Sequence, residues 1–215
     1  MARGTRRKTQ ETRDRLLDAA EDVFNAKGVS NTTLNDIAEA AGVTRGAIYW
    51  HFRNKVDLFN AMVDRVREPI RAMIEEIADE KTEDPLGRLR EKTLFVMREI
   101  LENDHYRKVM GILYHKCEFT DAASEFLEHY QEWVTRARNT VIQVLKNARQ
   151  KKQLPEDINI ELAGLALHVT FNGLLNSWLL MPDGFDLLED SSQLYEGIFS
   201  MLKNSPHMRV PGVSS

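Results

Sequence analysis

Apolar residues recur at helical spacing along almost the whole chain. Leu16, Ala20 and Phe24 lie on one face of a segment that Gly28 closes, and Leu34, Ile37 and Ala38 lie on one face of the next. No segment alternates apolar and polar residues as a half-buried strand does. The pattern predicts an all-α protein of about nine helices, over residues 9–27, 34–41, 45–51, 55–79, 85–102, 106–117, 121–152, 160–180 and 189–204.

Capping and helix-breaking residues set most of these boundaries. Thr33 and Thr44 stand before apolar runs, where a side-chain oxygen accepts hydrogen bonds from the first free amides of a helix. Asn54 starts a long helix in the same way, and Asp84-Pro85 pairs a cap with a proline at the first helical position. Pro69 lies inside the long helix and is expected to bend it, because proline removes a backbone donor.

Composition fits a globular chain with a sizeable core. Of its 215 residues, 42% are hydrophobic and 29% are charged. The helical pattern divides the chain into an N-terminal three-helix domain over residues 1–54, a larger helical domain over residues 55–205 and a flexible tail over residues 206–215. The single cysteine, Cys117, excludes an internal disulfide framework and suits a reducing cytoplasm.

Charge is distributed unevenly between the two ends. The net charge is −4, yet residues 1–58 hold ten Lys/Arg against eight Asp/Glu, and the first ten residues hold four cations and no acid. Arg6 and Arg7 belong to this basic N-terminal arm. A mildly basic head on an acidic body indicates that only the head meets a polyanion.

Residues 34–51 have the form of a helix-turn-helix, in which the N-terminal residues of the second helix meet base edges in the major groove. Arg45 can offer a two-pronged hydrogen bond to guanine, and Gly46 permits close approach to the duplex. Tyr49, His51 and Lys55 suit phosphate oxygens. Ile48 and Phe52 are assigned instead to the core of the head.

The segment from Leu162 to Met181 is apolar but carries His168, Asn172 and Asn176, so a buried helix is favoured over a membrane span. Because it is apolar nearly all round, it must be covered on more than one side. One stripe holds His168, Phe171, Asn172 and Leu175, and the other holds Leu167, Thr170, Leu174 and Trp178. We expect the first stripe to line a ligand pocket and the second to pack against a second copy of the chain.

Other chemistries find no support in the sequence. It has no GxxxxGK[ST], GxGxxG or HExxH motif, so no nucleotide cofactor is expected. His115-Lys116-Cys117-Glu118 matches no zinc spacing, and no second cysteine is present, so no metal and no catalytic site are expected.

The segment TTLNDIAEAAGVTRGAIYWHFRNKVDLFNAM closely resembles the DNA-binding domain of the TetR family of bacterial repressors. Two further segments, GILYHKCEFTD and NGLLNSWLLMPDGFDL, are similar to the AcrR and TtgR group, which represses operons for multidrug efflux pumps. The resemblance implies a homodimer that binds an inverted-repeat operator and leaves double-stranded DNA when a small molecule binds the body.

The resemblance also assigns residues. The positions that match the DNA-facing ones of the family are Thr33, Thr44, Arg45, Tyr49, His51 and Lys55, with Trp50 as a further candidate. The positions that match the ligand pocket of the family are Val66, Val96, Met110, Tyr114, Val134, His168, Phe171, Asn172, Leu175 and Asn176. We add Ile70, which lies on the same predicted helix as Val66. Leu167, Leu174 and Trp178 are assigned to the dimer interface.

The expected inducer is an aromatic or apolar drug, since methionine and aromatic side chains repack around varied shapes. The neutral amides of Asn172 and Asn176 leave its charge open. Two alternatives remain, a TetR-type regulator of lipid or aromatic metabolism and a helical ligand carrier without DNA contact. The carrier leaves the basic arm and the cluster from Thr44 to Lys55 unexplained.

Overall fold

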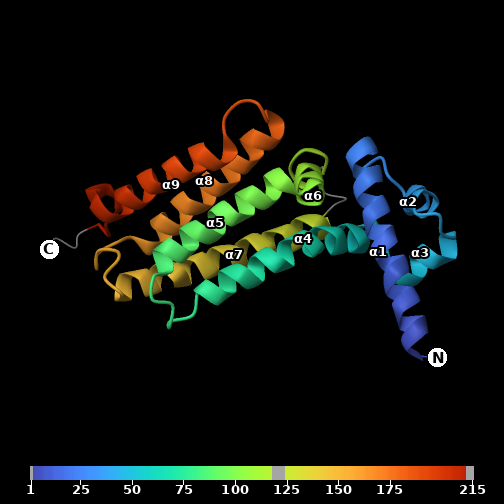
Figure 1. Ribbon diagram of the computed structural model, residues 1–215, viewed down its shortest axis with the longest axis horizontal. Helices are drawn as coiled ribbons and strands as arrows, with labels where there is room; N and C mark the ends of the chain where they lie inside the picture. The colour runs from blue at the N-terminus through green and yellow to red at the C-terminus, as the bar shows by residue number, and fades with distance from the viewer. Residues whose placement is uncertain (1, 118–123, 212–215) are drawn as a thin grey trace. The chain divides into compact units, whose positions relative to one another are not determined.

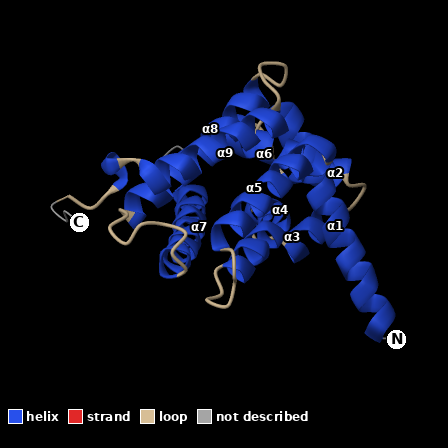
Figure 2. Ribbon diagram, turned by 60° about the vertical axis from the view of Figure 1, so that its left-hand side comes forward, coloured by secondary structure: helices blue, strands red, loops and turns tan. Residues whose placement is uncertain are grey.

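A computed structural model describes residues 2–117 and 124–211. Within these ranges the chain is helical and has no β-strand, apart from an isolated bridge between Ile158 and Arg209 (Figures 1 and 2). The helices are α1 (Ala2–Lys27), α2 (Leu34–Ala40), α3 (Arg45–His51), α4 (Lys55–Ile77), α5 (Pro85–Glu102), α6 (Asp104–His115), α7 (Ser124–Gln150), α8 (Ile160–Leu180), α9 (Leu187–Asn204) and the short 3-10 helix η2 (Pro206–Met208). The all-α prediction is confirmed.

The predicted caps hold the helix starts. Thr33 and Thr44 accept hydrogen bonds from Asp36 N and Ala47 N, and Asp84 accepts one from Gly87 N at 2.9 Å. Asn54 Oδ1 accepts from Asp57 N at 2.8 Å at the start of α4. These contacts satisfy amides that the helix itself cannot pair.

Two predicted helix starts differ from the structure, and a third cannot be compared. The first helix begins at Ala2 instead of Thr9, so the basic arm is helical. The sixth begins at Asp104, because Asn103 ends α5 and leaves no loop between them. The predicted start of the seventh helix at Thr120-Asp121 lies outside the described residues.

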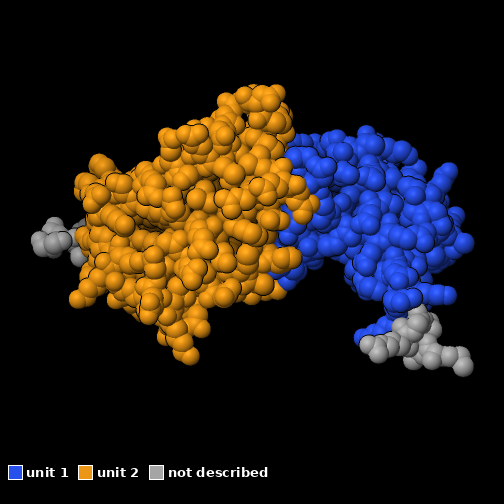
Figure 3. All heavy atoms as spheres, in the orientation of Figure 1, with its two compact units in different colours: residues 1–68, 104–131 blue, residues 69–103, 132–215 orange. Residues whose placement is uncertain are grey.

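The chain forms two compact units (Figure 3). Unit 1 comprises residues 1–68 and 104–131, and unit 2 comprises residues 69–103 and 132–215. Their borders fall inside α4, between Glu68 and Pro69, and inside α7. Packing therefore divides the chain later than the predicted end of the DNA-binding segment at residue 54, because the first half of α4 contacts α1 and the loop that follows α1.

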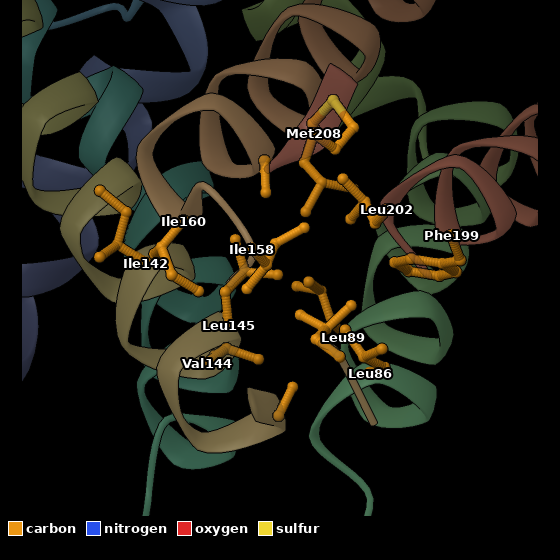
Figure 4. Close-up of a cluster of buried hydrophobic side chains, with 14 of the residues drawn as sticks. Leu86, Leu89, Ile142, Val144, Leu145, Ile158, Ile160, Phe199, Leu202 and Met208 are labelled. Carbon is orange, nitrogen blue, oxygen red and sulfur yellow. The ribbon is translucent and has the colours of Figure 1, made fainter. Parts of the chain in front are cut away.

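Each unit has its own apolar core. In unit 1 the buried ring of Phe59 lies edge-on to the rings of Phe24 and Phe126, with centroids 5.9 and 4.9 Å away. In unit 2, side chains from α5, α7, α8 and α9 meet in one cluster, of which Figure 4 labels Leu86, Leu89, Ile142, Val144, Leu145, Ile158, Ile160, Phe199, Leu202 and Met208. Burial of this kind supplies most of the stability of a helical unit.

Residues 206–210 are not the flexible tail that was predicted from residue 206. Met208 is buried in the core of unit 2, and its carbonyl accepts a hydrogen bond from Asn159 N at 2.8 Å. Arg209 Nε lies 3.2 Å from Asp157 Oδ1, and both side chains are largely buried. The segment is thus fixed to the loop before α8; residues 212–215 lie outside the described residues.

The apolar α8 segment was the one candidate for a membrane span. Across residues 2–117 and 124–211, no helix has both the length and the apolarity that a bilayer crossing requires.

Candidate DNA-binding surface and ligand cavity

A tight turn joins α2 to α3. Gly42 has a φ of +62°, a left-handed conformation that costs glycine little, and its amide donates to Glu39 O at 3.0 Å. The Val43 amide donates to Ala38 O at 3.0 Å, and Arg15 Nη2 on α1 donates to Ala41 O at 2.6 Å. These bonds fix the direction in which α3 leaves the turn.

Thr33 and Thr44 stand at the exposed N-termini of α2 and α3. Thr33 forms a capping box with Asp36, whose carboxylate accepts from both the hydroxyl and the amide of Thr33 at 2.7 and 2.8 Å. These hydrogen bonds, helped by Lys27 at 3.0 Å, hold the pKa of Asp36 far below its usual range. The carboxylate of Asp36 thus stands at the start of α2, whereas Thr44 caps α3 through its hydroxyl alone, so the start of α3 favours an anion more than the start of α2 does.

One face of α3 is exposed and carries predicted DNA-facing residues. Tyr49 is 49% exposed and Trp50 69% exposed, and the Arg45 guanidinium lies 5.8 Å from the centre of the Tyr49 ring. No atom lies within 4 Å of a Cβ placed on Gly46. The opposite face buries Ile48 and, at the helix end, Phe52, as predicted. The short helix is thus anchored on one side and open on the other.

Three other predicted DNA contacts differ in how exposed they are, namely Arg6, Arg7 and His51. Arg6 and Arg7 are exposed on α1, where Arg7 Nε lies 3.3 Å from Glu11 Oε1. His51 is half-buried, and burial, followed by the charge of Arg13, lowers its pKa. A phosphate contact by His51 would therefore use a neutral ring that donates a hydrogen bond.

The Lys55 ammonium, which was predicted to contact phosphate, is bound within the protein. Its ammonium donates to Val29 O, Ser30 O and Thr32 O at 2.7, 3.2 and 2.9 Å, which uses all three of its hydrogens. Burial lowers its pKa. We therefore reassign Lys55 from a phosphate contact to the support of the loop between α1 and α2.

Unit 2 contains an apolar cavity of about 100 Å³. The predicted ligand residues that line it are Ile70, Val96, His168, Phe171 and Asn172. The whole lining is Ile70, Arg71, Ile74, Leu89, Lys92, Thr93, Val96, Trp133, Ala137, Arg138, Thr140, Val141, Gly164, Leu167, His168, Phe171, Asn172 and Tyr195. Helices α4, α5, α7, α8 and α9 all contribute, so a bound molecule would touch most of unit 2.

The structure does not bring the other six predicted ligand residues to this cavity. Val66, Met110 and Tyr114 belong to unit 1. Val134, Leu175 and Asn176 belong to unit 2 but are absent from the lining; Leu175 is fully buried and Asn176 is exposed. Asn176 lies one turn after Asn172 on α8, beyond the last residue of α8 in the lining, and is exposed.

Sequence reasoning missed the charged part of the lining, which comprises Arg71, Lys92 and Arg138. Lys92 lies between Leu89 and Val96 on one face of α5, a spacing that the helical period alone could have revealed. Burial, and then the charge of Arg138, lowers the pKa of His168, so this ring is neutral near pH 7.

The predicted dimer residues need a correction. Leu167 and Trp178 are buried inside the protomer, and Leu167 belongs to its core, so neither can form the main interface. Leu174 is half-buried in a shallow groove with Ser177, Leu194 and Met201. The large apolar side chains that α8 and α9 do expose are Leu162, Leu165, Val169, Leu180, Leu194 and Met201.

No group of three or more His, Cys, Asp or Glu side chains with the spacing of a metal site occurs among the residues that the structure describes. The fold and these surfaces define a helix-turn-helix protein whose candidate ligand cavity lies in the other unit. Comparison with known proteins carries the assignment further.

Two family models match the chain. The model described as bacterial regulatory proteins, tetR family, matches residues 16–62, and that of the MAATS-type transcriptional repressor, C-terminal region, matches residues 84–204. The HTH-type transcriptional regulator TtgR of Pseudomonas putida is 41% identical over 209 residues, which cover 97% of this chain and 100% of TtgR. The chain therefore belongs to the TetR family of bacterial transcriptional regulators.

Solved structures of multidrug efflux pump repressors also match this chain. NalD, the secondary repressor of the MexAB-OprM multidrug efflux pump in Pseudomonas aeruginosa, matches with a TM-score of 0.82 and 36% identity, over 93% of this chain and 99% of NalD. SmeT, the repressor of the Stenotrophomonas maltophilia multidrug efflux pump SmeDEF, matches in its complex with triclosan with a TM-score of 0.85 and 31% identity, over 94% of this chain and 96% of SmeT.

Proposed function

We propose that this protein is a repressor that binds an inverted-repeat operator as a homodimer, controls a multidrug efflux operon and is released by small aromatic or apolar compounds. The observation that carries the proposal is the presence, on one TetR-family chain, of an open recognition-helix face and an apolar cavity walled by five helices.

The recognition face supports sequence-specific binding. Arg45 has an exposed guanidinium at the N-terminal end of α3, where such helices meet base edges. Tyr49 and Trp50 extend the exposed face, and the exposed start of α3 at Thr44 suits a phosphate oxygen. Residues 1–54 thus have the parts of a DNA-binding domain, with Lys55 fixing its first loop.

The cavity supports a small-molecule inducer. Its walls are mostly apolar, with Trp133 and Phe171 as aromatic surfaces. Its volume of about 100 Å³ is smaller than the roughly 300–1,000 Å³ of drug-sized sites, so ligand entry has to move the surrounding helices. A ligand that binds the widened form more tightly shifts the protein toward that form. Such a shift is what release from an operator requires.

The exposed apolar side chains of α8 and α9 support dimerisation. Leu165 and Val169 on α8 and Leu194 on α9 are each 45–53% exposed, and Leu180 is 65% exposed. Helices α8 and α9 pack side by side in unit 2 (Figure 1). Two copies that join these faces would bury them in a closed, two-fold interface. We assign the dimer contact to this surface in place of Leu167 and Trp178.

The same proposal gives the chain no catalytic role and places it in the cytoplasm, where its operator lies. The three relatives described above are named as transcriptional regulators or repressors, and none of them as an enzyme.

An electrophoretic mobility shift tests the proposal. Purified full-length protein should retard the DNA upstream of its own gene at nanomolar concentration and release it when triclosan or another aromatic antimicrobial is added. An unrelated duplex of equal length serves as the control. Equal retardation of both duplexes would contradict the repressor function, and retention of the operator at every compound tested would contradict the inducer role.

A further inference from the structure

We propose that the cavity of unit 2 selects apolar ligands that carry one anionic group, such as an aromatic carboxylate or phenolate, with the Lys92 ammonium as counter-ion. The inference rests on the proposed inducer role and adds the charge class of the inducer.

The charged residues of the lining are all cationic. Arg71, Lys92 and Arg138 contribute to the wall, and no Asp or Glu does so among the residues that the structure describes. Acids do pair with the two arginines, but from outside the lining. Glu75 accepts from Arg71 at 2.6 Å, and Glu161 accepts from Arg138 at 2.8 Å; the two carboxylates are 50% and 64% exposed.

Lys92 differs from these arginines. None of the hydrogen bonds or ion pairs found among residues 2–117 and 124–211 involves its ammonium. The residues on either side of it along the same face of α5, Leu89 and Val96, are buried and also line the cavity. Lys92 therefore contributes to the cavity wall a cationic side chain that has no counter-ion among the described residues.

The neutral polar side chains of the lining offer few free donors. The Thr93 hydroxyl donates to Leu89 O at 2.8 Å, and the Thr140 hydroxyl donates to Arg136 O at 3.0 Å. The Asn172 amide donates to His168 O at 2.8 Å. The Tyr195 hydroxyl and the neutral His168 ring are further donors of the lining, but an uncharged donor bonds an anionic oxygen more weakly than the Lys92 ammonium does.

The electrostatics favour an anion over a cation. An ionised group that leaves water for an apolar site is stable there only when it is paired and hydrogen-bonded. A carboxylate would gain a charge-assisted bond from Lys92, while an ammonium would meet the uncompensated like charge of Lys92 and find no carboxylate in the lining as described.

Three probes that share one aromatic frame test the charge preference. Calorimetry at pH 7 on the full-length protein compares 2-naphthoate, 2-naphthamide and 2-naphthylmethylammonium. The measured quantity is the ratio of naphthoate to naphthamide affinity within one variant, so that any loss of folded protein cancels. We expect a ratio of roughly tenfold in the wild type, the scale of one hydrogen bond to a charged group, and the weakest binding from the ammonium compound.

Variants then assign the preference to one side chain. Lys92→Met should bring the ratio close to one, Lys92→Arg should keep it, and Lys151→Met, at an exposed lysine that does not line the cavity, should leave the wild-type ratio. An equal affinity for the three probes, or an unchanged ratio in Lys92→Met, would overturn the inference. If naphthamide nevertheless binds and releases the operator, the proposed function stands. If no probe of any charge binds or releases the operator, both fail.

Discussion

Arg45 has the most specific predicted role of any single residue. Its guanidinium is exposed beside Tyr49 and has the planar geometry that pairs with guanine. We expect Arg45→Ala to weaken operator binding by about 1–3 kcal/mol while changing affinity for random DNA less. Fluorescence anisotropy on both duplexes measures this difference. Arg136→Ala, at an exposed arginine of α7, is the matched control. Wild-type operator affinity in Arg45→Ala would remove Arg45 from base recognition.

Lys55 stabilises the loop between α1 and α2. Lys55→Met keeps the length of the side chain but leaves three backbone carbonyls without their donor. We expect the free energy of unfolding to fall by about 1–3 kcal/mol, the scale of hydrogen bonds to a charged group. Urea titration measures the loss, with Lys151→Met as the control. Unchanged stability together with weaker DNA binding would restore the phosphate-contact role that we withdrew.

The lowered pKa of His168 predicts that the stability of the protein depends on pH. Burial and the charge of Arg138 lower its pKa below the usual 6.5, so the unfolded chain takes up a proton at a higher pH than the folded chain. Stability should therefore fall as the pH drops below about 6.5 toward the lowered pKa. In His168→Gln this decline should be shallower, and in the exposed-site control His207→Gln it should be unchanged. Thermal unfolding between pH 5 and 8 measures the slopes; equal slopes in His168→Gln and the wild type would contradict the assignment.

At the scale of the helices, α8 carries both side chains that are buried inside the protomer and exposed side chains that we assign to the contact between protomers. Val169 is 53% exposed, whereas Trp178 is 7% exposed. Val169→Asp should give a folded monomer that binds operator weakly, because two half-sites need two linked heads. Trp178→Asp should unfold unit 2 instead. Sedimentation and circular dichroism distinguish these results, with Phe95→Asp, at a 39% exposed position of α5, as the control. A stable Val169→Asp dimer at micromolar concentration would place the interface elsewhere.

The same helices explain what the sequence could and could not predict. Local signals such as Thr33, Thr44 and Asp84 set helix starts correctly, because a cap acts on amides within three residues of it. The phase of α8 was not predictable in the same way. Since nearly every face of that helix is apolar, periodicity alone cannot tell which stripe packs inside the protomer. Leu167 and Trp178 were assigned to the wrong partner for this reason.

Contacts between residues far apart in the sequence could not be predicted either. The carbonyls that hold Lys55 lie 23–26 residues earlier in the chain, and no pattern around Lys55 points to them. The cavity residues His168, Phe171 and Asn172 could be expected from one stripe of α8. The spacing of Lys92 from Leu89 and Val96 could have placed it on the same face of α5, but the meeting of Arg71, Lys92 and Arg138 could not be expected, since they come from three different helices.

At the scale of the whole molecule, α4 is the continuous element between the two functions. It begins at Lys55, which fixes the first loop of the head, and it carries Ile70 and Arg71 of the cavity lining. Pro69, inside it, removes one helical hydrogen bond at the border of the two units. We infer that a ligand acts on DNA by displacing this helix. A small tilt would spoil the fit of two heads to half-sites about 34–36 Å apart.

The most direct test of this account is the reciprocity of the two binding events. Calorimetry measures the affinity of the free dimer, and of the operator-bound dimer, for the aromatic compound that releases most operator. Operator affinity is measured with and without a saturating amount of the same compound. The account predicts that each partner weakens the other by the same factor, equivalent to a coupling of roughly 1–3 kcal/mol. Identical ligand affinity in the free and operator-bound protein would contradict it.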